Sequence, residues 1–316
     1  MNTLTLRIDR KTDETPNVCA LDLVAPDGAE LPAFTAGAHI DLHLGGGLIR
    51  QYSLYGDPAD RRRYRLAVLR EPASRGGSTM VHALQAGLEL TVSAPRNAFP
   101  LTASGPALLL GGGIGLTPLL SMADTLHAQG RPFTLHLCVR SRQRLPLAAH
   151  LAAVPWAAQV HVHADDEPAT ALDLPAVLAA ASPDTHAFCC GPAGFIAYAR
   201  GAVQAAGWPD TRWHSESFTP VAVCHSADGP FELELARSGR IIIVAANQTV
   251  AQALDDAGVG VSTSCEQGIC GACITKVISG TPDHRDSYLT DEELAAGDCF
   301  TPCVSRSRTA RLVVDL

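Results

Sequence analysis

The 316-residue chain is 47% hydrophobic and 18% charged, a composition that is typical of globular proteins and argues against a disordered chain. Its formal net charge of −8 argues against nucleic acid as a partner, and residues 226–316 carry −6 of that charge. The polar start and the lack of an apolar run of roughly 18 residues predict neither an export signal nor a membrane span, so we expect a cytoplasmic protein of two or three domains.

Residues 1–102 predict an antiparallel β-barrel domain, because short segments such as "LTLRID", "YRLAVLR" and "LELTVSA" alternate in polarity between glycines and prolines. The strand "RQYSL" (50–54) combines a cation, an aromatic ring and a hydroxyl, with Arg50 and Tyr52 on one face. These groups suit a flavin, although an exposed barrel strand is the alternative. In "SRGGSTMVH" (74–82), two glycines precede Ser78 and Thr79 at an expected helix start, which is typical of a phosphate-binding turn.

Residues 103–225 predict an α/β domain with a parallel sheet, because apolar strands alternate with helical stretches. The turn "GGGIGLTP" (111–118) follows a strand and opens a helix, for which we expect Thr117 as the N-cap and Pro118 as the first helical residue. Its glycines would let a diphosphate approach the backbone. Leu116 occupies the last glycine position of a G-x-G-x-x-G pattern, so a plain strand-to-helix turn stays an alternative.

A second glycine turn, "CCGPAGF" (189–195), also lies between an expected strand and an expected helix. Open α/β sheets bind ligands beyond the carboxyl ends of their strands, so both turns would border one crevice with Cys190 facing into it. A packed thiol is the alternative for Cys190. Three arginines after another strand could hold the 2′-phosphate of NADPH, or simply lie at the surface: Arg140, Arg142 and Arg144.

Residues 226–316 predict a third domain, with a β-hairpin in "FELELARS" and "RIIIVAA" and a helix whose N-cap is Thr249. Four cysteines follow the C-x4-C-x2-C…C spacing of plant-type 2Fe-2S proteins. They are Cys265, Cys270, Cys273 and Cys303. We expect them to hold a low-potential one-electron carrier. The alternatives are ordinary thiols, a zinc site, which would more usually offer two close pairs, and a ligand swap to Cys299.

The motifs "RQYSL", "RGGS", "GGGIGLTP", "CGP", "SESF" and "SCEQGICGAC…DHRDSYLTDEE…FTPCVSR" occur in this order along the chain. With them the chain resembles the phthalate dioxygenase reductase family, which includes the vanillate O-demethylase reductases. The resemblance covers essentially all residues. It implies a multidomain protein in the order flavin barrel, NAD-binding α/β domain and C-terminal β-grasp ferredoxin. It also implies FMN as the flavin, with FAD as the alternative, and NADH as the coenzyme, with NADPH as the alternative.

The resemblance also implies which residues form the sites. The flavin would be held by Arg50, Gln51, Tyr52, Ser53, Gly76, Gly77, Ser78 and Thr79, with Glu216 near it and Phe218 covering the ring. The pyridine nucleotide would meet Gly112, Gly113, Gly115, Thr117, Cys190, Gly191 and Pro192. No residue is expected to act as an acid–base catalyst. We interpret His161, His163 and His284 as packing or solvent-facing residues rather than metal ligands.

The implied activity is electron transfer. NADH delivers two electrons as a hydride whereas a 2Fe-2S cluster accepts one at a time, so a flavin must stand between them. By the resemblance, the acceptor would be a terminal Rieske-type oxygenase that acts on an aromatic acid or a similar small substrate. The net negative charge of residues 226–316 fits docking to such a partner. The alternatives are a stand-alone NAD(P)H diaphorase or flavin reductase and a non-enzymatic redox-sensing iron–sulfur protein.

Overall fold

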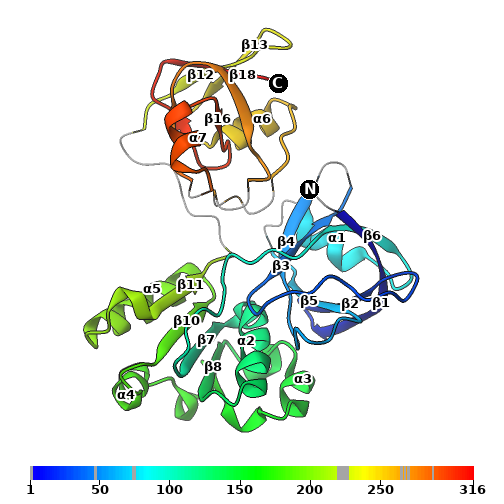
Figure 1. Cartoon of the computed structure of the whole chain (residues 1–316), viewed down its shortest axis with the longest axis vertical. Helices are drawn as coiled ribbons and strands as arrows, with labels where there is room; N and C mark the ends of the chain where they lie inside the picture. Colours follow the sequence, from blue (N-terminus) through cyan, green and yellow to red (C-terminus); the bar gives the residue numbers. More distant parts are fainter. Residues whose placement is uncertain are drawn as a thin grey trace. The chain divides into compact units, whose positions relative to one another are not determined.

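The computed structural model describes residues 3–45, 48–72, 76–218, 228–263, 266, 268, 271–286 and 288–316. The chain forms two compact units, one of residues 1–44 and 51–219 and the other of residues 45–50 and 220–316 (Figure 1). The described strands make three main sheets and one short two-stranded sheet. No described helix is long and apolar enough to cross a membrane.

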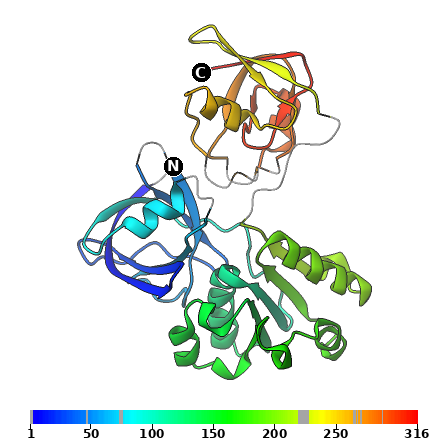
Figure 2. The same ribbon diagram turned by 180° about the vertical axis from the view of Figure 1, so that it is seen from behind.

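The first sheet has the strand order β4-β3-β6-β1-β2-β5, and each neighbouring pair from β3 to β5 in this order is antiparallel. Figure 2 shows this part of the chain from behind, in blue and cyan. Leu6 and Ile8 of β1 are buried while Thr5 and Asp9 are exposed, so the polar alternation of the sequence produces a one-sided core. The predicted antiparallel β domain is confirmed. Its elements are β1 (Thr3–Thr15), β2 (Val18–Val24), β3 (His39–His43), β4 (Ile49–Ser53), β5 (Tyr64–Leu69), α1 (Gly77–Ala83) and β6 (Glu89–Ser93).

The second sheet is parallel, in the order β11-β10-β7-β8-β9, as predicted for an α/β domain. Helix α2 packs on one face, against Leu109 and Leu135, whereas α4 and α5 cover Leu108 and Leu110 on the other. The two faces differ because successive side chains of a strand point in opposite directions. The strands are β7 (Ala107–Gly112), β8 (Phe133–Val139), β9 (Val160–Ala164), β10 (His186–Cys190) and β11 (Trp213–Glu216). The helices are α2 (Leu116–Ala128), α3 (Ala148–Ala153), α4 (Leu174–Ala180) and α5 (Ala193–Ala205).

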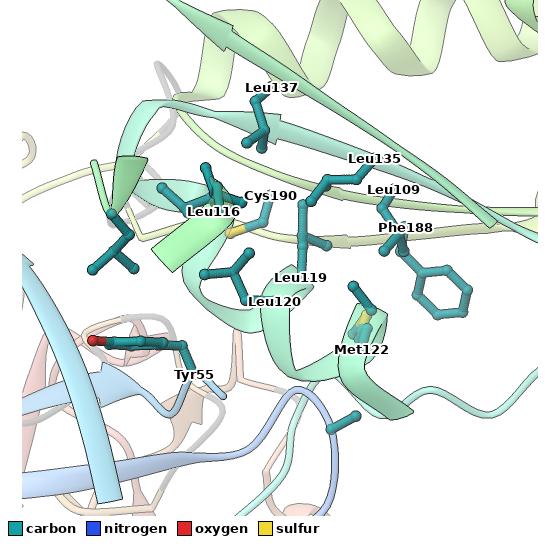
Figure 3. Packing of buried hydrophobic residues seen from close by; sticks show 14 of the residues in the cluster. Tyr55, Leu109, Leu116, Leu119, Leu120, Met122, Leu135, Leu137, Phe188 and Cys190 are labelled. Carbon is teal, nitrogen blue, oxygen red and sulfur yellow. The ribbon is translucent and has the colours of Figure 1, made fainter. Parts of the chain in front are cut away.

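These two sheets share one hydrophobic core. Tyr55, from the barrel part of the chain, belongs to the same buried cluster as Leu120 and Met122 of α2 (Figure 3). Phe99 is a further member of this cluster. The amide of Gly37 also donates a hydrogen bond to the Oγ of Ser121, at 3.1 Å. Because apolar side chains of both parts are removed from water together, the barrel and the α/β domain form a single unit.

The third domain is a mixed sheet in the order β13-β12-β18-β14-β16, with α6 packed on it. The predicted β12–β13 hairpin is present, and β12 pairs parallel with β18. Thr249 is the N-cap of α6, as predicted, and forms a capping box with Gln252. The elements are β12 (Phe231–Leu235), β13 (Arg240–Val244), α6 (Val250–Asp256), β14 (Thr275–Ser279), β15 (Pro282–Asp283), α7 (Asp291–Ala296), β16 (Cys299–Phe300), β17 (Arg306–Ser307) and β18 (Arg311–Val314).

The start of α2 differs from the sequence prediction. A 3₁₀ turn over Gly113–Gly115 leads directly into α2, whose first residue is Leu116, so Thr117 and Pro118 already lie inside the helix. The hydroxyl of Thr117 donates to the carbonyl of Ile114, at 3.2 Å, and does not cap the helix. The prediction that Thr117 is the N-cap was therefore wrong, because the glycines let the chain begin winding two residues earlier.

Candidate functional site

The parallel strands of the α/β domain all end at the same edge of the sheet. Cys190 of β10 pairs in register with Gly111 of β7 on one side and with Glu216 of β11 on the other. The two glycine turns, which follow β7 and β10, therefore leave the sheet as neighbours. This edge is where open α/β sheets bind dinucleotides.

The two glycine turns touch each other directly. A Cβ atom built on Gly115 would lie 2.3 Å from the carbonyl oxygen of Cys190 and 2.7 Å from the amide nitrogen of Gly191. A Cβ on Gly112 would lie 2.9 Å from the ring of Pro192. Glycine is thus needed at both positions for close backbone packing. Gly113, with a φ of 56°, has open space beside it, so its backbone can be approached from outside.

Cys190 does not line an opening. Its side chain is fully buried and belongs to the same buried cluster as Leu116, Leu119 and Phe188 (Figure 3). Burial, and secondly the nearby carboxyl of Glu216, raises the pKa of the Cys190 thiol well above its usual range. The expectation that its side chain faces into the crevice is corrected, because the last residue of β10 points toward α2.

Glu216 is the most perturbed acid at this edge. Burial raises its pKa to about 8, so the carboxyl group keeps its proton at neutral pH. Its Oε2 atom is buried and has no hydrogen-bond partner among the described residues. A buried polar atom without a partner costs free energy unless a bound group supplies one. Glu216 is therefore a candidate hydrogen-bond donor to a ligand. Phe218, two residues further on, is 43% exposed.

We predict that Glu216→Gln removes part of the pH dependence of stability. An unfolded glutamate titrates near about 4.3, so between roughly pH 4.5 and 8 only the folded chain holds this proton. The contribution of this proton to the free energy of unfolding is therefore fully present below the unfolded pKa. It falls as the pH rises toward the folded pKa of about 8, and it amounts to a few kcal/mol at most. Urea denaturation at pH 5.5 and pH 8.5 should show a larger drop for the wild type than for Glu216→Gln. Equal drops would refute the assignment.

The predicted flavin strand, β4, contains a second buried group without a partner. The Nε2 atom of Gln51 is buried and makes no hydrogen bond to the described residues. Ser53 is buried, whereas Tyr52 is half-buried. The guanidinium of Arg50 donates to the carbonyl of Ile49, at 2.8 Å. The amide of Gln51 fits a ligand that offers a hydrogen-bond acceptor at this strand.

The predicted phosphate turn precedes α1. Gly76 adopts a φ of 95°, which strongly favours glycine, and Gly77 begins the helix. The hydroxyl of Ser78 accepts a hydrogen bond from the amide of Glu71, at 3.1 Å, while Thr79 is exposed. The hydroxyl of Ser78 thus links the start of α1 to Glu71.

Two of the four predicted iron ligands come together in the third domain. The Sγ atoms of Cys273 and Cys303 lie 3.3 Å apart, and both residues are buried. Cys265 and Cys270 lie outside the described residues. Cys299 is half-buried in β16, where it pairs with Lys276 of β14. Cys303, and not Cys299, is therefore the distant thiol that meets Cys273.

Two glycines that lie between the predicted ligands are tightly enclosed. A Cβ atom on Gly271 would lie 2.3 Å from the ring of Tyr288, and one on Gly268 would lie 2.9 Å from the Cα of Asp286. Both glycines have positive φ, 69° and 71°. Two converging thiols beside these glycines match half of the four-thiolate donor set of a 2Fe-2S cluster, so the described residues fit that group.

The segment across this loop is braced by a carboxylate that the sequence did not single out. Asp286 accepts hydrogen bonds from the Oγ of Ser305, at 3.2 Å, and from the amide of Leu289, at 3.0 Å. These bonds hold Tyr288 in place over Gly271. The only sequence signal was the "DHRDSYL" string itself, because the partner Ser305 is distant along the chain.

The histidines singled out in the sequence form no metal site within the described part of the chain. The Nδ1 atom of His163 lies 2.6 Å from the carbonyl oxygen of Thr170, and its Nε2 atom lies 3.0 Å from the Nδ1 atom of His136. His161 packs beside His136, and His284 lies in the "DHRD" loop, 3.8 Å from a carboxylate oxygen of Asp286.

A family model, the 2Fe-2S iron-sulfur cluster binding domain, matches residues 233–308. The vanillate O-demethylase oxidoreductase of Pseudomonas sp. strain HR199 is 46% identical over 303 residues, which are 95% of this chain and 96% of the relative. The phthalate dioxygenase reductase of Burkholderia cepacia is 38% identical over 317 residues, 99% of this chain and 97% of the relative. The chain belongs to the phthalate dioxygenase reductase family.

A solved phthalate dioxygenase reductase, described as a modular structure for electron transfer from pyridine nucleotides to 2Fe-2S, matches with a TM-score of 0.75 at 37% identity. The match covers 100% of this chain and 98% of that one. Like the phthalate dioxygenase reductases, the chain is an oxidoreductase built from a flavin barrel, a nucleotide-binding α/β domain and a C-terminal ferredoxin domain. The predicted fold class and family are confirmed.

Proposed function

We propose that the chain is the reductase component of a multicomponent Rieske-type oxygenase, which takes a hydride from NADH onto FMN and sends single electrons through a 2Fe-2S cluster to the terminal oxygenase. The main support for this proposal is the pair of buried thiols of Cys273 and Cys303. The same chain also contains a barrel and a parallel sheet with two adjacent glycine turns. A hydride donor and a one-electron acceptor can be connected only when all three parts are present.

In this proposal β4 and the turn before α1 hold FMN, which when bound supplies a centre that accepts a hydride and releases electrons singly. Arg50 would offset the phosphate charge, and the buried amide of Gln51 would donate to an acceptor of the ring. Further contacts would come from Tyr52, Ser53, Gly76, Gly77, Ser78 and Thr79. FAD is the alternative flavin.

The neighbouring glycine turns would receive the coenzyme. The backbone of Gly112 and Gly113 would approach its diphosphate, and Gly191 and Pro192 would border the nicotinamide. Because Thr117, Cys190 and Gly115 are buried, their contribution would be to shape the two turns. Protonated Glu216 would place a neutral donor, and no negative charge, next to the hydride path. Phe218 would cover the flavin ring.

For the acceptor, we propose a terminal oxygenase that acts on an aromatic acid or a similar small substrate. The names of two relatives support this, a vanillate O-demethylase oxidoreductase and a phenoxybenzoate dioxygenase subunit beta from Ectopseudomonas oleovorans that is 44% identical over 100% of this chain. The net negative charge of residues 226–316 suits a partner with a basic face. We place this reaction in the cytoplasm, where free thiols such as those of Cys19 and Cys189 persist.

The proposal predicts the outcome of an anaerobic NADH titration of the purified protein. Visible absorbance should show bleaching of the flavin, and low-temperature electron paramagnetic resonance should show a reduced two-iron cluster. Bleaching without a cluster signal would instead indicate a stand-alone flavin reductase. A protein that neither bleaches nor develops the signal would not be a reductase.

A further inference from the structure

Two loops of opposite charge leave the α/β sheet side by side. The loop after β8 carries three arginines and the loop after β9 carries three acids: Arg140, Arg142 and Arg144, and Asp165, Asp166 and Glu167. The last residues of the two parallel strands, Val139 and Ala164, pair in register. The amide of Asp165 also donates to the carbonyl of Val139, at 3.0 Å. Both loops thus lie at the edge of the sheet where β7 ends in its glycine turn.

Within this pair of loops, one arginine is neutralised by one acid. The Nε of Arg142 donates to both carboxylate oxygens of Glu167, at 3.0 Å to Oε1 and 2.7 Å to Oε2. The two side chains are 51% and 40% exposed, so a ligand can reach them from solvent. The exposed side chains of Arg140 and Arg144 make no ion pair with the described residues.

Glu167 is held in this place by its own turn. The amide and the hydroxyl of Thr170 both donate to the carbonyl of Glu167, at 2.8 and 2.9 Å. The same hydroxyl accepts a hydrogen bond from the amide of Ala164, at 3.0 Å, which ties the turn to the end of β9. The carboxylate of Glu167 is therefore presented to Arg142 by fixed backbone, not by a freely moving loop.

The position of the Arg142–Glu167 pair matters because the adenosine ribose of a bound dinucleotide would lie near it. When a glycine turn binds the diphosphate, the end of the adjacent strand meets the adenosine ribose. An acid there suits the 2′-hydroxyl of NADH, and a free arginine suits the 2′-phosphate of NADPH, which adds a charge of roughly −2. The strand next to β7 on this side is β8, which leads into Arg142. Alone, its arginines would favour NADPH.

We propose that Glu167 is a specificity-determining residue of the coenzyme site. By pairing with Arg142 it neutralises one of the three cations that a 2′-phosphate could contact, and it brings the summed charge of the two loops to zero. The chain therefore discriminates against NADPH and accepts NADH. This inference rests on the proposed function and assigns its coenzyme preference to one ion pair.

The test compares two probes that differ only in the 2′-phosphate, adenosine 2′,5′-bisphosphate and 5′-AMP, by calorimetry on the flavin- and cluster-loaded protein at low salt. Glu167→Gln should tighten binding of the bisphosphate relative to 5′-AMP on the order of five- to tenfold, because it frees the Arg142 guanidinium. The matched control Asp166→Asn removes the same charge from the same loop without touching the pair. It should change the ratio by about twofold or less, since solvent and salt screen the charge.

A double variant with Arg142→Gln and Glu167→Gln should return the probe ratio to the wild-type value. An unchanged ratio in Glu167→Gln, an equal gain in Asp166→Asn, or a gain that persists in the double variant would each overturn the assignment. Anaerobic reduction of wild-type flavin by NADH separates this failure from failure of the proposed function. If NADH reduces the flavin and the ratio does not respond, only the role of Glu167 is wrong.

Discussion

Replacing Cys273 by serine is expected to abolish the 2Fe-2S cluster while NADH still reduces the flavin. The Cys273 thiol is buried and lies 3.3 Å from that of Cys303, so the substitution would remove one of the four proposed cluster ligands. Reduction of cytochrome c, which draws electrons from the cluster, should fall on the order of tenfold or more, whereas reduction of ferricyanide from the flavin should persist.

The matched control for this variant is Cys299→Ser. Cys299 is close to Cys303 in the sequence but lies in β16 beside Lys276, so the cluster signal and cytochrome c reduction should survive. If Cys299→Ser lost the cluster and Cys273→Ser kept it, the ligand assignment would be wrong. Loss of flavin reduction in Cys273→Ser would mean that the two units do not act separately.

The second large effect is expected for Gly115→Ala. The new methyl group would lie 2.3 Å from the Cys190 carbonyl oxygen and 2.7 Å from the Gly191 amide nitrogen, and backbone atoms cannot rotate away as a side chain can. The two glycine turns would have to separate. We expect a loss of about 3 kcal/mol in the free energy of unfolding, measured by urea denaturation, and weaker NADH binding.

Gly194→Ala provides the comparison, because Gly194 lies in α5 and a Cβ there meets no atom within 4 Å. Alanine also favours a helix over glycine, so this variant should be neutral or more stable by up to about 1 kcal/mol. Similar losses in both variants would show that the contact between the turns does not matter. A stable Gly115→Ala that binds NADH normally would contradict the geometry directly.

Features that depend on neighbouring residues could be predicted from the sequence. The polar alternation of β1, the Thr249 capping box and the hairpin of β12 and β13 are local, since each depends on residues a few positions apart. Three of the four cysteines of the motif are also close together in the sequence, whereas the fourth, Cys303, meets Cys273 only in the folded chain. The family resemblance rested on such strings, and the comparisons confirmed it.

Features that depend on packing could not be predicted in this way. Whether the Cys190 thiol faces a crevice or α2, and where α2 begins, is decided by how the strand end packs against Leu116 and its neighbours. The raised pKa of Glu216 follows from burial, which no pattern of charges reveals.

The sequence by itself thus determined the three domains, the cysteine motif and the family, because these follow from short motifs and their spacing along the chain. Only the tertiary structure decided which groups meet across long separations. Glu167 reaches Arg142 because β8 and β9 pair in parallel, and Asp286 reaches Ser305 because β15 pairs with β17. Hydrogen bonds and ion pairs act over about 3 Å in space, whatever the distance between their partners in the sequence.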